Sequence, residues 1–180
     1  TTGAGIEAPN TDFVGPALHA VDAPPLRYEF TQWRPLDLPF KVGLGSSAAA
    51  TVAAVAAGDF ARRGEIGDDP SLAARVHKEI QGSGSGLDVW ASWMGGANLF
   101  RRRGDNGYEG DAIHTPPITV VHTGQVASTG PRVERWLQWS LAERANFAAA
   151  AADCTEQFLS DPVGALSAYG ELLNLATTSA

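Results

Sequence analysis

The chain has 180 residues, of which 44% are hydrophobic and 18% charged, and its formal net charge is −7. This length allows one domain or two small ones, and the composition excludes a disordered or collagen-like chain. An acidic chain also lacks the Lys/Arg density that nonspecific nucleic-acid binding requires. The single Cys154 excludes an internal disulfide, which fits a reducing compartment. Because no apolar run reaches about 18 residues and no signal peptide is visible, we expect a cytoplasmic protein without a membrane span.

The elements expected along the chain are mostly helical. Hydrophobic periodicity and turn residues predict helices at 13–21, from about 47 to 63, and at 72–81, 87–93, 128–159 and 162–175, and strands at 26–30, 97–102 and 118–122. Leu26, Tyr28 and Phe30 alternate with polar residues, which is the period of a half-buried strand. The polar stretch 104–110 is expected to be a loop. Because strands and helices do not alternate regularly, the pattern is typical of an α+β fold.

A first glycine-rich loop, Gly43-Leu-Gly-Ser-Ser47, precedes an Ala-rich helix, with Ser46 or Ser47 expected near its N-cap. Small residues at the start of a helix leave backbone N–H groups accessible, and these groups attract anions together with the helix dipole. A phosphate is the natural ligand, and a serine hydroxyl there could also reach a Mg²⁺ ion. A plain glycine turn with a serine N-cap and no ligand is the alternative.

Other phosphate-binding patterns fit this loop less well. The P-loop pattern is absent, since no Gly-Lys pair occurs in the chain. The dinucleotide pattern G-x-G-x-x-[GA] is met by Gly43, Gly45 and Ala48, and Glu65 has the spacing of its acidic residue. That pattern needs a strand directly before the loop, where this chain has Pro39, and a regular βαβ unit, which is not visible. A dinucleotide-binding oxidoreductase is therefore not favoured.

Residues 39–49 read P-F-K-V-G-L-G-S-S-A-A and fit the pattern P-x-x-x-G-L-G-S-S-A-A at every fixed position. This run resembles the ATP-phosphate loop of the GHMP kinases, the family of galactokinase, homoserine kinase, mevalonate kinase and phosphomevalonate kinase. The resemblance implies that the loop holds the triphosphate of ATP and that Ser47 helps to hold Mg²⁺. The nucleotide-binding residues it implies are Lys41, Gly43, Leu44, Gly45, Ser46, Ser47 and Ala48.

A second glycine-rich run, 82–88, ends in Ser85-Gly-Leu-Asp88. A carboxylate after such a loop could accept or orient the proton of a substrate hydroxyl, although a lone Asp there is more simply a helix N-cap. With the following Gly95-Gly96, the run resembles the second signature of the mevalonate-pathway branch of the same family. The resemblance implies that Asp88 acts on the acceptor as a base or an orienting group and that Ser85 lines the acceptor pocket. For an acceptor that is already a phosphate, Asp88 would position groups rather than remove a proton.

Several residues have two interpretations. His77 stands where mevalonate kinases carry a glutamate ligand of Mg²⁺, and it is otherwise a polar helix residue. Trp90 replaces a small residue of the family and either reshapes the acceptor pocket or fills the core. The run 101–103 is three arginines, either a solvated strand end or a contact for an anionic acceptor. The segment 123–129 is a further acceptor-site candidate because it joins an expected strand to an expected helix.

The resemblance as a whole implies a ribosomal-protein-S5-like α+β kinase core with an unusual left-handed βαβ crossover. We expect residues 1–129 to be the nucleotide-binding part and 130–180 a helical segment that begins a C-terminal lobe, so the chain would be partial and incomplete at both ends. The expected reaction is transfer of the ATP γ-phosphoryl group to a small acceptor, most simply phosphomevalonate or mevalonate. The alternatives are a sugar kinase of the family and a non-catalytic nucleotide-binding member. The expected partners are ATP, Mg²⁺, a small-molecule acceptor and, as a candidate, a second copy of the chain, but neither nucleic acid nor membrane.

Overall fold

The computed structural model describes residues 11–31, 43–82, 84–104, 107–115, 117–121 and 129–178. The chain divides into two compact units, Thr1–Thr115 and Pro116–Ala180. Each unit is described by itself. The expected nucleotide-binding part, 1–129, extends further along the chain than the first unit and stays a prediction.

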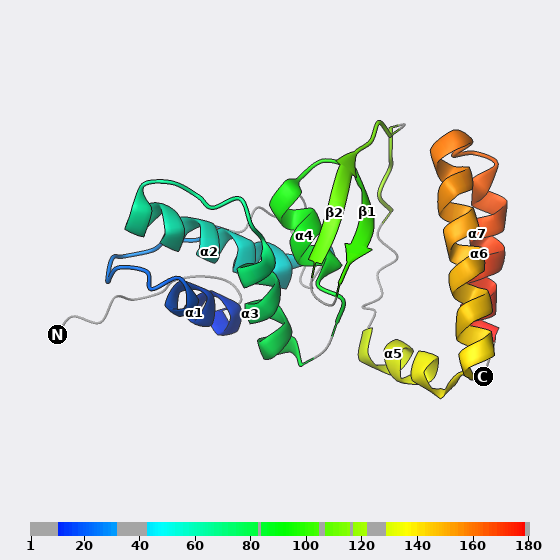
Figure 1. Cartoon of the computed structure of the whole chain (residues 1–180), viewed down its shortest axis with the longest axis horizontal. Helices are drawn as coiled ribbons and strands as arrows, with labels where there is room; N and C mark the ends of the chain where they lie inside the picture. Colours follow the sequence, from blue (N-terminus) through cyan, green and yellow to red (C-terminus); the bar gives the residue numbers. More distant parts are fainter. Residues whose placement is uncertain are drawn as a thin grey trace. The chain divides into compact units, whose positions relative to one another are not determined.

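The first unit contains four helices and a two-stranded antiparallel sheet among its described residues (Figure 1). They are α1 (Thr11–Ala20), α2 (Ser46–Arg63), α3 (Ser71–Gln81), α4 (Leu87–Met94), β1 (Asn98–Arg103) and β2 (Gly107–Ala112). The helices expected at 13–21, about 47–63, 72–81 and 87–93 and the strand expected at 97–102 are confirmed within a few residues. A helix-rich unit with a small sheet is compatible with the α+β class.

The core of the first unit lies where α1, α2 and α3 meet. The buried residues of α1 are spaced three or four apart and form one helical stripe. They are Val14, Ala17, Leu18 and Val21, the last just beyond the end of the helix. Small buried residues of α2, including Ala48 and Ala54, let the helices approach closely. Burying a Val or Leu side chain stabilises the fold by about 1.5–3 kcal/mol. The packing of α1 on the rest of the unit is therefore stabilised mainly by this stripe.

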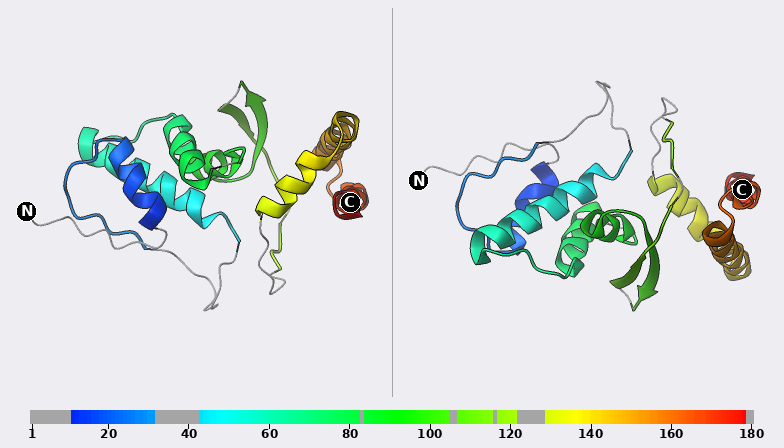
Figure 2. Two further views of the ribbon diagram at one scale, coloured as in Figure 1. Left: turned by 90° about the horizontal axis from the view of Figure 1, so that it is seen from below. Right: turned by 90° about the horizontal axis from the view of Figure 1, so that it is seen from above.

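The sheet lies beside α4 and packs on it with one face (Figures 1 and 2). Tyr108 of β2 makes edge-on ring contacts with Trp90 of α4 and Phe100 of β1, with centroids 6.0 and 6.2 Å apart. Met94 of α4 packs directly over Gly110, since a Cβ there would lie 2.8 Å from its sulfur. The loop expected at 104–110 is therefore wrong from residue 107 onward, because pairing with β1 and these ring contacts stabilise a strand that lacks apolar alternation.

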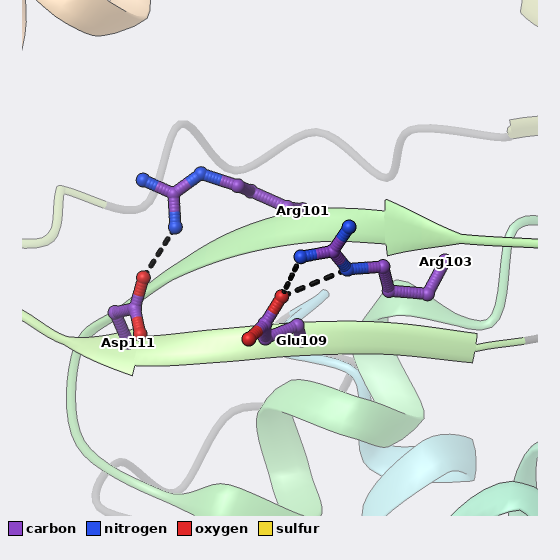
Figure 3. A network of polar contacts seen from close by, with 4 residues as sticks. All are labelled: Arg101, Arg103, Glu109 and Asp111. Carbon is purple, nitrogen blue, oxygen red and sulfur yellow. Dashed lines mark hydrogen bonds and ion pairs between the residues drawn. The ribbon is translucent and has the colours of Figure 1, made fainter.

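The other face of the hairpin carries charges (Figure 3). Arg101 pairs with Asp111, and Arg103 pairs with Glu109 through two hydrogen bonds. Each pair runs diagonally across the strands, since Arg101 lies opposite Glu109 and Arg103 opposite Gly107. All four side chains are more than half exposed, so the pairs hold a solvent-facing surface and add little stability.

Two of the three expected strands do not form among the described residues. Within 26–30, the one residue with a strand-like bridge is Glu29, and the hydroxyl of Tyr28 donates to the carbonyl of Pro24 at 3.1 Å. The part of 118–122 that is described, 118–121, has no regular secondary structure, and its Ile118, Val120 and Val121 are exposed. Period-2 alternation predicts a surface suited to a sheet, but a strand also needs a partner with free hydrogen-bonding groups.

The second unit contains three helices, α5 (Thr129–Gln138), α6 (Leu141–Ser160) and α7 (Ala165–Thr178). The single helix expected at 128–159 is wrong, because Trp139 and Ser140 interrupt it. Ser140 begins α6 as a capping box: its hydroxyl accepts the N–H of Glu143 at 3.2 Å, and the Glu143 carboxylate accepts the N–H of Ser140 at 2.7 Å. These bonds favour the charged carboxylate and lower the pKa of Glu143.

Aromatic rings join the two helices on either side of this break. Trp136, Trp139 and Phe147 lie 5.2–5.5 Å apart between ring centroids. This supports a packing role for the two tryptophans. Helices α6 and α7 lie side by side in every view (Figures 1 and 2), and buried Cys154 and Leu172 lie in their contact.

Candidate functional site

The first glycine-rich loop enters α2 through two residues in the left-handed region. Gly43 has φ +79° and Gly45 has φ +72°. Residues with a Cβ rarely adopt this conformation, so glycine is needed at both positions. Gly45 is the N-cap of α2 and no side chain caps the helix there; Ser46 and Ser47, expected near the N-cap, are the first two residues of the helix. The loop thus leads into a helix N-terminus that offers backbone N–H groups and a positive dipole end, which is the geometry of an anion site.

Ser47, in the first turn of α2, makes polar contacts through both its backbone and its side chain. Its carbonyl accepts the hydroxyl of Thr51 at 2.9 Å, and Thr51 is fully buried. Its own Oγ lies 3.2 Å from Nε2 of His77 on α3. Ala48, next in the chain, is fully buried and fixes the start of α2 in the core, whereas Leu44 at the tip of the loop is 68% exposed.

His77 is among the most buried side chains of the unit, with 2% of its surface exposed. Its ring stacks on Phe13 of α1, with centroids 5.1 Å apart and planes 29° from parallel. Desolvation lowers the pKa of His77, and the negative charge of Asp88 opposes this shift. The imidazole is therefore neutral over most of the physiological pH range. His77 is more than a polar helix residue, since its ring connects α1, α2 and α3.

The second glycine-rich loop connects α3 to α4 and, like the first loop, has left-handed glycines where it meets a helix. Gly82 (φ +79°) ends α3, and Gly86 (φ +77°) is the N-cap of α4. Ser85 lies between them: its Oγ accepts the N–H of Leu87 at 3.3 Å, and its carbonyl accepts the Tyr108 hydroxyl, also at 3.3 Å. Tyr108 thereby ties the second loop to the sheet. The sequence offered no signal for this role, because residue 108 falls in a stretch expected to be a loop.

Asp88 is the second residue of α4 and is exposed. Its Oδ1 accepts the N–H of Val89 at 3.0 Å. The N-cap interpretation of Asp88 is wrong, since Gly86 occupies that position. The carboxylate is close enough to His77 to influence its pKa, so Asp88 lies near the contact between His77 and Ser47.

A cleft of about 400 Å³ lies between α3 and the second loop. It is lined by Ala74, Arg75, Lys78, Glu79, Gly82, Ser85 and Gly86. Neither Arg75 nor Lys78 makes an ion pair with any acidic residue in the described part of the chain. Neither Arg75 nor Lys78 is among the site residues expected from the sequence. Two cations, one carboxylate and a serine hydroxyl give this lining a net positive charge, which suits a small ligand that carries an anionic group.

Residues 35–96 match the GHMP kinases N terminal domain. The matched segment is roughly one third of the chain and contains both glycine-rich loops. The match supports the GHMP kinase family, and with it a small-molecule kinase that uses ATP. The comparison does not identify the branch or the acceptor. No curated protein and no solved structure matches the chain.

A magnesium ion in a GHMP kinase would need oxygen ligands, usually one or two carboxylates besides the phosphates of the nucleotide. Within the described ranges, no group of three or more His, Cys, Asp or Glu side chains could hold a metal ion. The hydroxyl of Ser47 faces an imidazole nitrogen rather than a carboxylate. These residues do not form a protein-built magnesium site, and the role of Ser47 as a metal ligand stays a prediction.

The remaining candidates are placed as follows. Lys41 and residues 123–128 lie outside the described residues. Arg101 and Arg103 are engaged in the ion pairs of Figure 3, which favours the solvated strand end over an acceptor contact. Trp90 packs against the core, and its buried indole Nε1 has no hydrogen-bond partner among the residues that the structure describes, which favours the core-filling interpretation. None of the helices in the described ranges is long and apolar enough to cross a membrane.

Proposed function

We propose that the chain is the nucleotide-binding part of a GHMP-type kinase that transfers the γ-phosphoryl group of ATP to mevalonate or phosphomevalonate. The observation that carries the proposal is the pair of left-handed glycines, Gly43 and Gly45, entering α2 inside the segment that matches the family. An S5-like core for the complete domain is part of the same proposal.

The donor side of the proposed site is the first turn of α2. Backbone N–H groups there and the hydroxyl of Ser47 would bind the phosphates of ATP. Phosphoryl transfer needs the attacking and leaving oxygens in line and the charge on the equatorial oxygens neutralised. The rigid start of α2, fixed by Ala48 and Thr51, supplies the positioning that such a reaction needs.

The acceptor side is the second loop, with Ser85 and Asp88. An exposed carboxylate at the start of α4 can orient the oxygen that attacks the γ-phosphorus, and with mevalonate it can also accept the hydroxyl proton. With phosphomevalonate the attacking oxygen belongs to a phosphate, so orientation is enough. Tyr108 holds the loop through the carbonyl of Ser85.

The cleft beside this loop supports an anionic acceptor over a neutral sugar. Mevalonate carries a carboxylate, and phosphomevalonate carries a phosphate as well. Arg75 and Lys78 lie three residues apart on α3 and both line the cleft, so they can bind one anionic group together. The carboxylate of Glu79 in the same lining offsets one of these charges, and a neutral sugar would leave the remaining positive charge without a partner.

The experiment is an ADP-release assay on the full chain with ATP and four acceptors, namely mevalonate, phosphomevalonate, galactose and homoserine. We expect turnover with an anionic acceptor of the mevalonate series and a large loss in Asp88→Asn and Ser47→Ala. Glu65→Gln is the matched control. Glu65 is exposed after α2, and its loss should leave turnover unchanged. Turnover with galactose alone would replace the proposal by the sugar-kinase alternative.

A melting experiment with ATP distinguishes the non-catalytic alternative. A ligand that binds the folded chain adds RT ln(1 + [L]/Kd) to its free energy of unfolding and so raises its melting temperature. A rise with ATP but no turnover on any acceptor would indicate a nucleotide-binding member without activity. Stabilisation by NAD but not by ATP, lost in Glu65→Gln, would indicate the dinucleotide-binding alternative.

A further inference from the structure

We propose that His77 is a positioning residue, which holds the hydroxyl of Ser47 for a nucleotide phosphate and links the two glycine-rich loops. The inference rests on the proposed function, since it assigns a task to a side chain beside the proposed ATP site. His77 is not assigned contact with the nucleotide. It acts through Ser47.

The contact joins residues 30 positions apart in the chain. Ser47 lies in the first turn of α2, directly after the first loop, and His77 lies in α3, which ends at Gly82 where the second loop begins. A shift of α3 would therefore move the partner of Ser47 Oγ. This hydrogen bond therefore couples the position of the first loop to that of the second.

The surroundings of His77 explain why it can act as a fixed support. Phe13 covers one side of the ring by stacking, and 2% of the residue is exposed. A buried imidazole has few rotamers available, and it needs hydrogen-bond partners to offset its desolvation. The hydroxyl of Ser47 at 3.2 Å is such a partner. With the proton of the neutral imidazole on Nε2, the ring donates to Ser47 Oγ and leaves the hydroxyl proton free for a phosphate oxygen, without the entropy cost of ordering the side chain first.

Thr51 completes the arrangement from the other side. Its hydroxyl donates to the carbonyl of Ser47, and Thr51 itself is fully buried. The backbone of Ser47 is thereby fixed by α2, and the side chain by α3. The remaining freedom of Ser47 is the orientation of its hydroxyl, and the contact with His77 restricts that orientation.

The test uses four variants of the full chain and measures ATP binding by titration calorimetry. His77→Leu removes the ring nitrogens and keeps an apolar side chain against Phe13. His77→Gln keeps a polar nitrogen at similar reach. We expect about three- to tenfold weaker ATP binding in His77→Leu, which corresponds to one lost hydrogen bond, and near-wild-type binding in His77→Gln. Ser47→Ala should weaken binding as much or more, and the double variant Ser47→Ala/His77→Leu should bind as Ser47→Ala does.

A purely structural role for His77 gives a different pattern. It would lower the melting temperature of His77→Leu but leave the affinity for ATP unchanged, or its effect would add to that of Ser47→Ala in the double variant. Either result overturns the inference while the proposed function stands. A wild-type chain that binds no ATP would overturn both.

A spectroscopic measurement tests the contact without any ligand. The ¹⁵N signals of the His77 ring report its hydrogen bonding, so Ser47→Ala should shift them. Ser71→Ala is the matched control, because Ser71 is on the same helix as His77 and its N–H bonds to Asp69 instead. Ring signals that are unchanged in Ser47→Ala would contradict the contact itself.

Discussion

Gly58 of α2 lies directly against Val21, which follows α1. A Cβ built on Gly58 would lie 2.3 Å from Cγ2 of Val21 and 3.1 Å from Cβ of Ala23. Real Cβ atoms do not approach other atoms this closely, so the absence of a side chain at Gly58 sets the distance between the two segments. The packing of α1 on α2, which brings Phe13 near His77, depends on this glycine.

Gly58→Ala is therefore expected to destabilise the protein. Alanine improves helix propensity by about 1 kcal/mol, but the clash with Val21 costs about 1–3 kcal/mol and should prevail. The control is Gly170→Ala in the middle of α7, where nothing lies within 4 Å of an added Cβ. At Gly170 only the gain in helix propensity applies. Urea unfolding should therefore show a lower free energy of unfolding for Gly58→Ala and a higher one for Gly170→Ala. Equal effects would refute the packing argument.

His77 predicts a pH dependence of stability. Its pKa is lowered in the folded protein by desolvation, against an opposing effect of Asp88, whereas in the unfolded chain it is about 6.5. Below about pH 6.5 the unfolded chain thus binds more protons at this residue, and the free energy of unfolding falls as the pH falls. Urea unfolding at a series of pH values between about 7.5 and 5 measures the effect. His77→Gln should give a flatter profile, and an identical profile would contradict the assignment.

The capping box of α6 predicts a loss of stability in Ser140→Ala. The variant removes the acceptor of the Glu143 N–H, and loss of such a cap costs about 1 kcal/mol. Ser160→Ala, at the other end of α6, is the control, because its hydroxyl donates to the carbonyl of Gln157 on an exposed surface. We expect a change within about 0.5 kcal/mol for this control in chemical unfolding. A Ser140→Ala chain as stable as wild type would mean that the break does not depend on the cap.

The ion pairs predict unequal effects of two charge-removing substitutions. The Asp59 side chain is 10% exposed and accepts a hydrogen bond from Arg63 at 2.6 Å, whereas the Glu109 side chain of the hairpin is 51% exposed. Asp59→Asn should cost about 1.5 kcal/mol or more, as for a buried charged hydrogen bond. Glu109→Gln should cost less than about 1 kcal/mol. Chemical unfolding in low and high salt checks the order, and a larger loss in Glu109→Gln would reverse it.

Much of the local structure could be predicted from the sequence. The helices around the two glycine-rich loops follow from periodicity and from glycines that only a turn or helix end requires, such as Gly45 and Gly86. The interruption at Ser140 could also have been found, because Ser140 and Glu143 have capping-box spacing within an Ala-rich run. Strand β2 could not, since its pairing partner and the rings that stabilise Tyr108 come from elsewhere in the chain.

The candidate site shows the same division between local and long-range information. The loops themselves carry recognisable patterns of glycine and serine. The stacking of Phe13 on His77, the contact of His77 with Ser47 and the support of Ser85 by Tyr108 all join residues at least 23 positions apart. No local pattern encodes such contacts. They arise when the helices pack, and they determine which polar side chains of the loops are held in place.

Helices α2 and α6 begin in opposite ways, with a consequence for amide exchange. Gly45 has no side chain to offer the first turn of α2, whereas Ser140 and Glu143 close the first turn of α6. In deuterated water the amides at the start of α2 should lose their protons sooner than those at the start of α6. An anion bound at the start of α2 would slow amide exchange there and leave exchange at the start of α6 unchanged. The α6 amides therefore serve as an internal reference for detecting ligand binding at α2.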